Sequence, residues 1–135
     1  MSEPLRILVV DDHHLILRLL EMILEVGGHV PVCVESGTLA LAEAHRDPPD
    51  LAIVDEVMEG LSGSDVIRAL RASADPRLAR VPIVGISGRL ASRDGLLAAG
   101  ADAFITKPVD ERTLLETIDQ LVRHTVGAHA GQPAA

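Results

Sequence analysis

Short runs of apolar, mostly β-branched residues alternate with amphipathic stretches along most of the chain. These runs are Leu5–Val10, Val30–Val34, Leu51–Val54, Pro82–Ser87 and Ala103–Thr106. None of them alternates between apolar and polar positions, and continuous apolar runs of this length are typical of strands buried on both faces. The pattern therefore predicts five strands inside a parallel sheet.

Helical periodicity fills the segments between these runs. It is clearest over residues 15–24, where apolar side chains recur at three- and four-residue spacing until Gly27 and Gly28 end the pattern. Weaker versions predict helices over Thr38–His45, Ser64–Ala72, Ala91–Ala99 and Glu111–Arg123. Strand and helix alternate throughout, which predicts an α/β fold with a doubly wound five-stranded parallel sheet and five helices. Residues 1–124 are expected to form this domain, and residues 125–135, without periodicity, a disordered tail or linker stub.

Composition restricts the compartment and the partners. The 135-residue chain has room for one domain and contains a single cysteine, Cys33, which cannot form an internal disulfide. It shows neither a signal peptide nor an apolar run long enough to cross a membrane, so we expect a cytoplasmic protein without membrane contact. The formal net charge of −8 and the single aromatic residue argue against nucleic-acid binding by this chain.

Reactive or ligating side chains follow four of the five predicted strands. They are Asp11 and Asp12, Asp55, Ser87, and Lys107, which is the only lysine of the chain. Ligands of open parallel sheets bind at the carboxyl ends of the strands, so we expect these residues at one edge. Each has an ordinary structural alternative, such as Asp12 capping the next helix, but four coincidences at one edge favour a site.

The chemistry of this set suits metal-assisted phosphoryl transfer. Clustered carboxylates repel one another, and a small hard cation such as Mg²⁺ relieves that repulsion through oxygen ligands. A carboxylate can accept a phosphoryl group as an acyl phosphate, while an ammonium and a hydroxyl stabilise the transferred oxygens. His13 and His14 point in different directions on a helix, so they are not expected to share a metal ion.

These motifs, taken in order, resemble the receiver domain of bacterial two-component response regulators over residues 5–123, in particular the single-domain, chemotaxis-type members. The matching segments are Val9–His13, Asp50–Asp55, Met58, Gly63, Pro82–Ser87, Gly100–Ala101 and Phe104–Pro108. The resemblance implies a flavodoxin-like sheet with strand order 2-1-3-4-5. It also implies a switch that changes its affinity for a downstream protein after phosphorylation, rather than an enzyme acting on other substrates.

The resemblance assigns roles to the residues of the predicted site. Asp55 would be the phosphoacceptor, with a sensor histidine kinase or histidine phosphotransfer protein as donor. Asp12 and Asp55 would ligate Mg²⁺ directly, together with the backbone carbonyl of Val57, and Asp11 through water. Lys107 would contact the phosphoryl oxygens.

The resemblance also implies a conformational switch. Ser87 would move to bond the phosphoryl group, Phe104 would turn inward, and Pro108 would follow a cis peptide bond. The surface formed by the fourth predicted helix, the fifth strand and the fifth helix would bind an unknown downstream protein, and the chain would be a monomer or a weak homodimer.

The sequence departs from the family pattern at three positions. Glu59 stands where proline is usual, which adds negative charge near the site. Gly88 replaces the more usual alanine and Gly95 interrupts the helix predicted over Ala91–Ala99, so we expect that helix to be mobile. Glu56 and Arg89 occupy variable positions where side chains tune the lifetime of the phosphoryl group.

The alternatives to a phosphorylated switch are a protein-binding module and, on the same sheet topology, a flavin carrier or a small enzyme. Glu59 is the feature that favours a phosphorylation-independent, receiver-like protein-binding module. A flavin carrier is disfavoured because the acidic Asp11-Asp12 pair would repel a flavin phosphate after the first strand. A dehalogenase-type phosphatase would require its second acid two residues after the first, whereas these two acids are adjacent.

Overall fold

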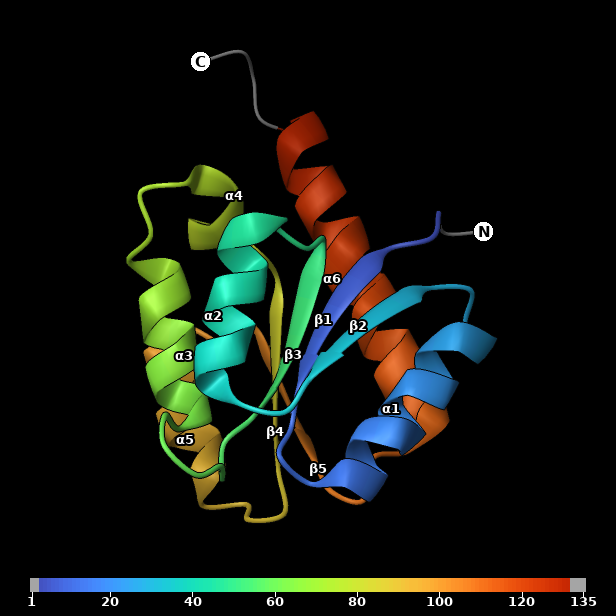
Figure 1. Cartoon of the computed structure of the whole chain (residues 1–135). Coiled ribbons are helices and arrows are strands. Elements are labelled where there is room, and N and C mark those ends of the chain that lie inside the picture. Colours follow the sequence, from blue (N-terminus) through green and yellow to red (C-terminus); the bar gives the residue numbers. More distant parts are fainter. Residues whose placement is uncertain (1–2, 132–135) are drawn as a thin grey trace.

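A parallel sheet lies between two layers of helices in this computed structural model, which describes residues 3–131 (Figure 1). The strands are β1 (Arg6–Val10), β2 (Val30–Val34), β3 (Leu51–Asp55), β4 (Ile83–Ser87) and β5 (Ala103–Thr106). The helices are α1 (His14–Val26), α2 (Gly37–Arg46), α3 (Gly63–Arg71), α4 (Pro76–Ala79), α5 (Ser92–Ala99) and α6 (Glu111–Gly131). All strand pairs are parallel, and the order β2-β1-β3-β4-β5 confirms the expected flavodoxin-like topology.

Each face of the sheet has its own apolar core. Successive strand residues point to opposite faces, so Leu8 and Val10 join a cluster with α2, α3 and α5, whereas Ile7 and Val9 join one with α1 and α6. Figure 1 shows these two helix layers on either side of the sheet. Every residue of β3 and β4 is buried. Burial on both faces explains why the predicted strands lack polar alternation.

The structure contains one helix that the sequence pattern did not predict. α4 is four residues long, too short to show a periodicity. It begins at Pro76 after the Asp75 side chain, which accepts a hydrogen bond from the Arg77 amide at 3.0 Å. Proline in the first turn and an aspartate cap are favourable at a helix start. The expected number of five helices is therefore wrong by this short turn.

The last helix is longer than predicted. Its apolar periodicity stops at Val122, yet α6 continues past the expected end at Arg123 to Gly131. Between Glu111 and Pro133 the sequence contains no proline, and its alanines favour continuation of the helix. The expected disordered tail is thus helical up to Gly131, and its remainder lies outside the described residues. The division of the chain at residue 124 stays a prediction.

At the edge of the sheet opposite the carboxyl ends of the strands, one guanidinium group connects α3 to the neighbouring segments. Arg71 of α3 donates to the carbonyl oxygens of Gly100, Ala79 and Val81 and to the Asp102 carboxylate, at 2.7–3.1 Å. Asp102 also accepts the Ile83 amide at 2.8 Å, which anchors the start of β4. Within residues 3–131, no helix has the length and apolar character needed to span a membrane.

Candidate functional site

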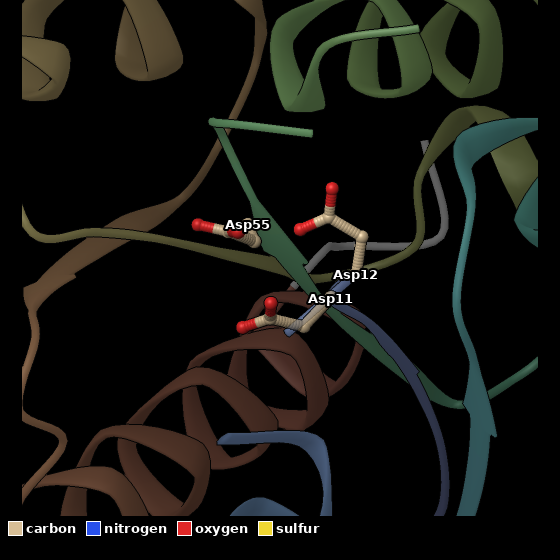
Figure 2. A group of neighbouring side chains, drawn as sticks. All are labelled: Asp11, Asp12 and Asp55. Carbon is tan, nitrogen blue, oxygen red and sulfur yellow. The ribbon is translucent and has the colours of Figure 1, made fainter. Parts of the chain in front are cut away.

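Three carboxylates meet at the carboxyl ends of β1 and β3 (Figure 2). Asp11 and Asp12 directly follow β1, and Asp55 is the last residue of β3. These strands are neighbours, paired Val10 to Val54, so their ends lie side by side. One ligand oxygen of each carboxylate lies within 4.8 Å of the others. Asp11 and Asp55 are buried, whereas Asp12 is exposed, so the cluster opens to solvent on one side.

The single lysine of the chain reaches this cluster from the end of β5. Lys107 Nζ lies 3.0 Å from Asp11 Oδ2 and 3.1 Å from Asp55 Oδ1. Partial burial lowers the pKa of Lys107, but the two carboxylates outweigh that effect and raise it overall, so the ammonium stays charged. Its backbone amide donates to the Ser87 carbonyl at 2.9 Å, which holds it beside β4, and the Lys107–Pro108 peptide bond is cis.

The cluster has less positive charge than its carboxylates require. Burial and the charge of Asp11 raise the pKa of Asp55 to about 6, although Lys107 opposes this shift. Asp11 Oδ2 is buried and faces the ammonium without accepting a well-directed hydrogen bond from any described residue. A hard divalent cation supplies charge and takes oxygen ligands, so this set of donors fits Mg²⁺.

Asp12 does not cap the following helix, so the structural alternative considered for it is wrong. Its Oδ2 accepts the Glu59 amide at 3.1 Å, which ties the loop after β3 to the acidic cluster. His13 caps α1 instead, with its Nδ1 3.4 Å from the Ile16 amide. Asp11 Oδ1 accepts the His13 amide at 2.8 Å, which orients its other oxygen toward Lys107.

The loop between β3 and α3 is held close to Asp55. A Cβ on Gly63 would collide with the backbone carbonyl of Asp55, so a side chain cannot be placed there without moving the loop. The Glu56 carboxylate accepts the Ser64 amide at 2.8 Å and the Ser64 hydroxyl at 2.9 Å. Glu56 therefore points to the start of α3 rather than into the site. Val57 is exposed in this loop.

The two residues expected to switch lie on neighbouring strands. Ser87 ends β4, is buried, donates its hydroxyl to Ser92 Oγ at 3.0 Å and accepts the Arg89 amide at 3.1 Å. Phe104 of β5 is half-buried against the core beneath α5. Ser92 was not among the residues that the sequence pattern predicts for the site. Its place in the first turn of the helix that follows Ser87 was the available signal.

Comparisons with known proteins agree with this geometry. The family model of the response regulator receiver domain matches residues 7–119. The chain belongs to this family. It is 34% identical to protein PilH of Pseudomonas aeruginosa, with 87% of this chain and 97% of that protein covered. It is also 34% identical to the nitrate/nitrite response regulator protein homolog of Haemophilus influenzae, but there it spans 93% of its own length and 61% of the relative.

Solved receiver structures have the same fold. A response regulator from Chloroflexus aurantiacus superposes with a TM-score of 0.83 at 24% identity, covering 90% of this receiver and 99% of that chain. The receiver domain of sensor histidine kinase PA1611 from P. aeruginosa superposes with a TM-score of 0.81 at 25% identity, covering 88% and 98%. That second structure has a magnesium ion coordinated in its active-site cleft.

Proposed function

We propose that this receiver is a phosphorylation-activated switch in which Asp55 accepts a phosphoryl group from a phosphohistidine. The donor would be a sensor histidine kinase or a histidine phosphotransfer protein. The observation that carries the proposal is the buried contact of Lys107 with both Asp11 and Asp55, at 3.0 and 3.1 Å, beside an exposed third carboxylate. The family membership and the raised pKa of Asp55 support the same assignment.

The residues that would hold Mg²⁺ are Asp11, Asp12 and Asp55, with the Val57 carbonyl as a further ligand. When bound, the ion neutralises charge on the carboxylates and on the transferring phosphoryl oxygens. Two observations support this ligand set: among the described residues none donates a well-directed hydrogen bond to the buried Asp11 Oδ2, and positive charge at Asp55 is insufficient.

The chain itself positions the nucleophile and the transferred group. An oxygen of Asp55 forms the new P–O bond while the P–N bond of the donor histidine breaks, and the departing imidazole takes up a proton. Lys107 already lies 3.1 Å from Asp55 Oδ1, so its ammonium can donate to the phosphoryl oxygens after transfer. Hydrolysis of the acyl phosphate releases inorganic phosphate and regenerates the Asp55 carboxylate. In this cycle the protein reacts with its own phosphoryl group and not with a separate substrate.

The switch would act through the hydroxyl of Ser87. To donate to a phosphoryl group on Asp55, this hydroxyl must leave Ser92, its partner at the start of α5. Phosphorylation therefore exchanges one hydrogen bond for another, and α5 loses a tether. With Phe104 turned inward, the surface of α5, β5 and α6 would change its affinity for a downstream protein. Contacts that form only in the phosphorylated state would shift the equilibrium between the two conformations of the receiver.

The alternative is a receiver-like module that binds its partner without phosphorylation. Glu59 is the observation that favours it, because this loop bonds Asp12 and carries an additional carboxylate where the family pattern has proline. More negative charge near the acidic cluster opposes the approach of an anionic phosphodonor.

Intact mass after incubation with a small-molecule phosphodonor and Mg²⁺ tests the proposal. We expect one phosphoryl adduct on the wild type, none on Asp55→Asn, and none after chelation of the metal. No adduct on a folded wild type, together with no binding of beryllofluoride, would favour the phosphorylation-independent module. Glu59→Gln is a useful companion variant because it keeps the amide bond to Asp12, so faster labelling would show that the Glu59 charge slows phosphorylation.

A further inference from the structure

The start of α5 is held to the sheet by a pair of hydroxyl groups. The buried side chains of this helix, Leu96 and Ala99, lie in its second half. Ala91, the residue before the helix, carries no hydrogen-bonding side chain, so no side-chain cap is present. Ser92, the first residue of α5, instead accepts the hydroxyl of Ser87 at 3.0 Å. Within residues 3–131, this is the one side-chain hydrogen bond that joins the first turn of α5 to the sheet.

The helices α1 to α4 begin in a different way. Each follows a residue whose own side chain accepts a backbone amide of the first turn: His13, Ser36, Ser62 and Asp75. Such a cap belongs to the same chain segment as its helix, so it does not respond to a change on another element. The first turn of α5 depends on the orientation of a side chain at the end of β4 instead.

Three hydrogen bonds close a ring between the end of β4 and the start of α5. The Ser87 hydroxyl donates to Ser92 Oγ, the Arg89 amide donates to Ser87 Oγ at 3.1 Å, and the Ser92 amide donates to the Arg89 carbonyl at 3.0 Å. Ser87 is completely buried, so bulk water does not offer its hydroxyl a replacement acceptor. A hydroxyl group has one hydrogen, so donation to Ser92 excludes donation to any other group.

We propose that Ser92 is a positioning residue that holds the Ser87 hydroxyl in its resting orientation and thereby opposes activation of the receiver. This inference rests on the proposed function, in which the same hydroxyl donates to a phosphoryl group on Asp55. The phosphoryl group must compete with Ser92 for one hydrogen, and breaking the resting bond consumes part of its interaction free energy. Ser92 therefore sets the fraction of phosphorylated protein that takes the active conformation.

Removal of the Ser92 hydroxyl distinguishes this positioning role from a structural one. Without it, the buried hydroxyl of Ser87 loses its acceptor in the resting conformation, whereas the phosphorylated conformation keeps its own acceptor. The equilibrium then shifts toward the phosphorylated conformation, so an analogue of the phosphoryl group should bind more tightly. A residue that only stabilised the fold would, when removed, weaken the binding of the analogue or leave it unchanged.

Amide hydrogen exchange of the full chain, measured by NMR without metal or phosphodonor, tests the resting contact. Ser92→Ala should speed exchange of the Arg93 and Leu96 amides about fivefold, although alanine is the better helix former and its propensity acts in the opposite direction. In a Ser87→Ala background the same substitution should add nothing, because the shared bond is already absent. Ser92→Thr keeps the hydroxyl and should exchange like the wild type. Ser36→Ala, which removes a serine bond at the start of α2, is the matched control and should leave α5 unchanged.

Titration of the same variants with beryllofluoride and Mg²⁺ tests the effect on activation. Ser92→Ala should bind beryllofluoride about two- to tenfold more tightly than the wild type, Ser92→Thr should bind like the wild type, and Ser92→Ala should have no effect in the Ser87→Ala background. Equal or weaker binding by Ser92→Ala, or the same gain without the Ser87 hydroxyl, would overturn the proposal, as would unchanged amide exchange in Ser92→Ala. If no form binds beryllofluoride, the proposed function fails together with the role of Ser92 in activation, and faster exchange would then leave only the resting contact.

Discussion

Replacing the candidate phosphoacceptor should stabilise the metal-free protein. Asp55 is buried between Asp11 and Lys107, and its pKa is raised to about 6 from the ordinary 3.8 because burial and Asp11 outweigh the lysine. The carboxylate charge is therefore unfavourable in the folded state. Asp55→Asn keeps the shape of the side chain and removes that charge.

The size of the effect follows from the pKa. A rise from 3.8 to about 6 corresponds to about 3 kcal/mol of unfolding free energy at any pH above the folded-state value. Below pH 3.8 the Asp55 carboxyl is protonated in the folded and the unfolded state, so this penalty is absent. The penalty develops as the pH rises from 3.8 to about 6. Because Lys107 also loses one partner in the variant, we expect a net gain of about 1–3 kcal/mol at pH 7.5.

Urea unfolding in EDTA at pH 7.5 and pH 5 measures this gain. The advantage of Asp55→Asn should shrink by about half at pH 5, where the wild-type carboxyl is mostly protonated. Asp94→Asn, whose side chain is 93% exposed, is the control and should change stability by less than about 0.5 kcal/mol. Adding Mg²⁺ should raise the stability of the wild type much more than that of the variant.

A destabilising effect of the Asp55 charge would be refuted by a variant that is no more stable than the wild type at pH 7.5 without metal. An advantage that stays equal at pH 5 and pH 7.5 would also refute it, since the gain would then come from packing. A larger effect of Mg²⁺ on the variant than on the wild type would exclude Asp55 as a metal ligand.

Three further predictions concern the rest of the fold. Arg71→Ala should lower stability in urea by about 2–3 kcal/mol, and Arg71→Lys should recover only part of it, because one ammonium cannot reach three carbonyls and a carboxylate. Gly95→Ala should stabilise α5 by about 0.5–1 kcal/mol and slow its amide exchange, since the added methyl group meets open space; unchanged exchange would contradict the expected mobility of this uncapped helix. Cys33 should resist alkylation at pH 8 in the folded protein, because burial and then Glu21 and Glu25 raise its pKa to about 11; labelling as fast as in urea would contradict this.

The sequence determined the strands, the sheet type and the edge at which the polar residues gather. Strands buried on both faces must be apolar throughout, so their pattern is visible without a structure. The carboxyl ends of parallel strands share one edge, so Asp11, Asp55, Ser87 and Lys107 could be placed together from their positions in the chain. The pattern failed at α4, which is too short to show a periodicity, and beyond Arg123, where α6 continues to Gly131 without apolar periodicity in the sequence.

The interactions of these side chains depend on the folded arrangement. It turned the Glu56 carboxylate to Ser64 and the Ser87 hydroxyl to Ser92, and it gave Asp12 a partner in the loop after β3. It also left Leu15, Leu19 and Met22 of α1 exposed, which periodicity alone could not distinguish from core. These outcomes depend on distances between groups far apart in the chain. Hydrogen bonds and charges act over a few ångströms, so they are specified only when the folded chain brings the partners together.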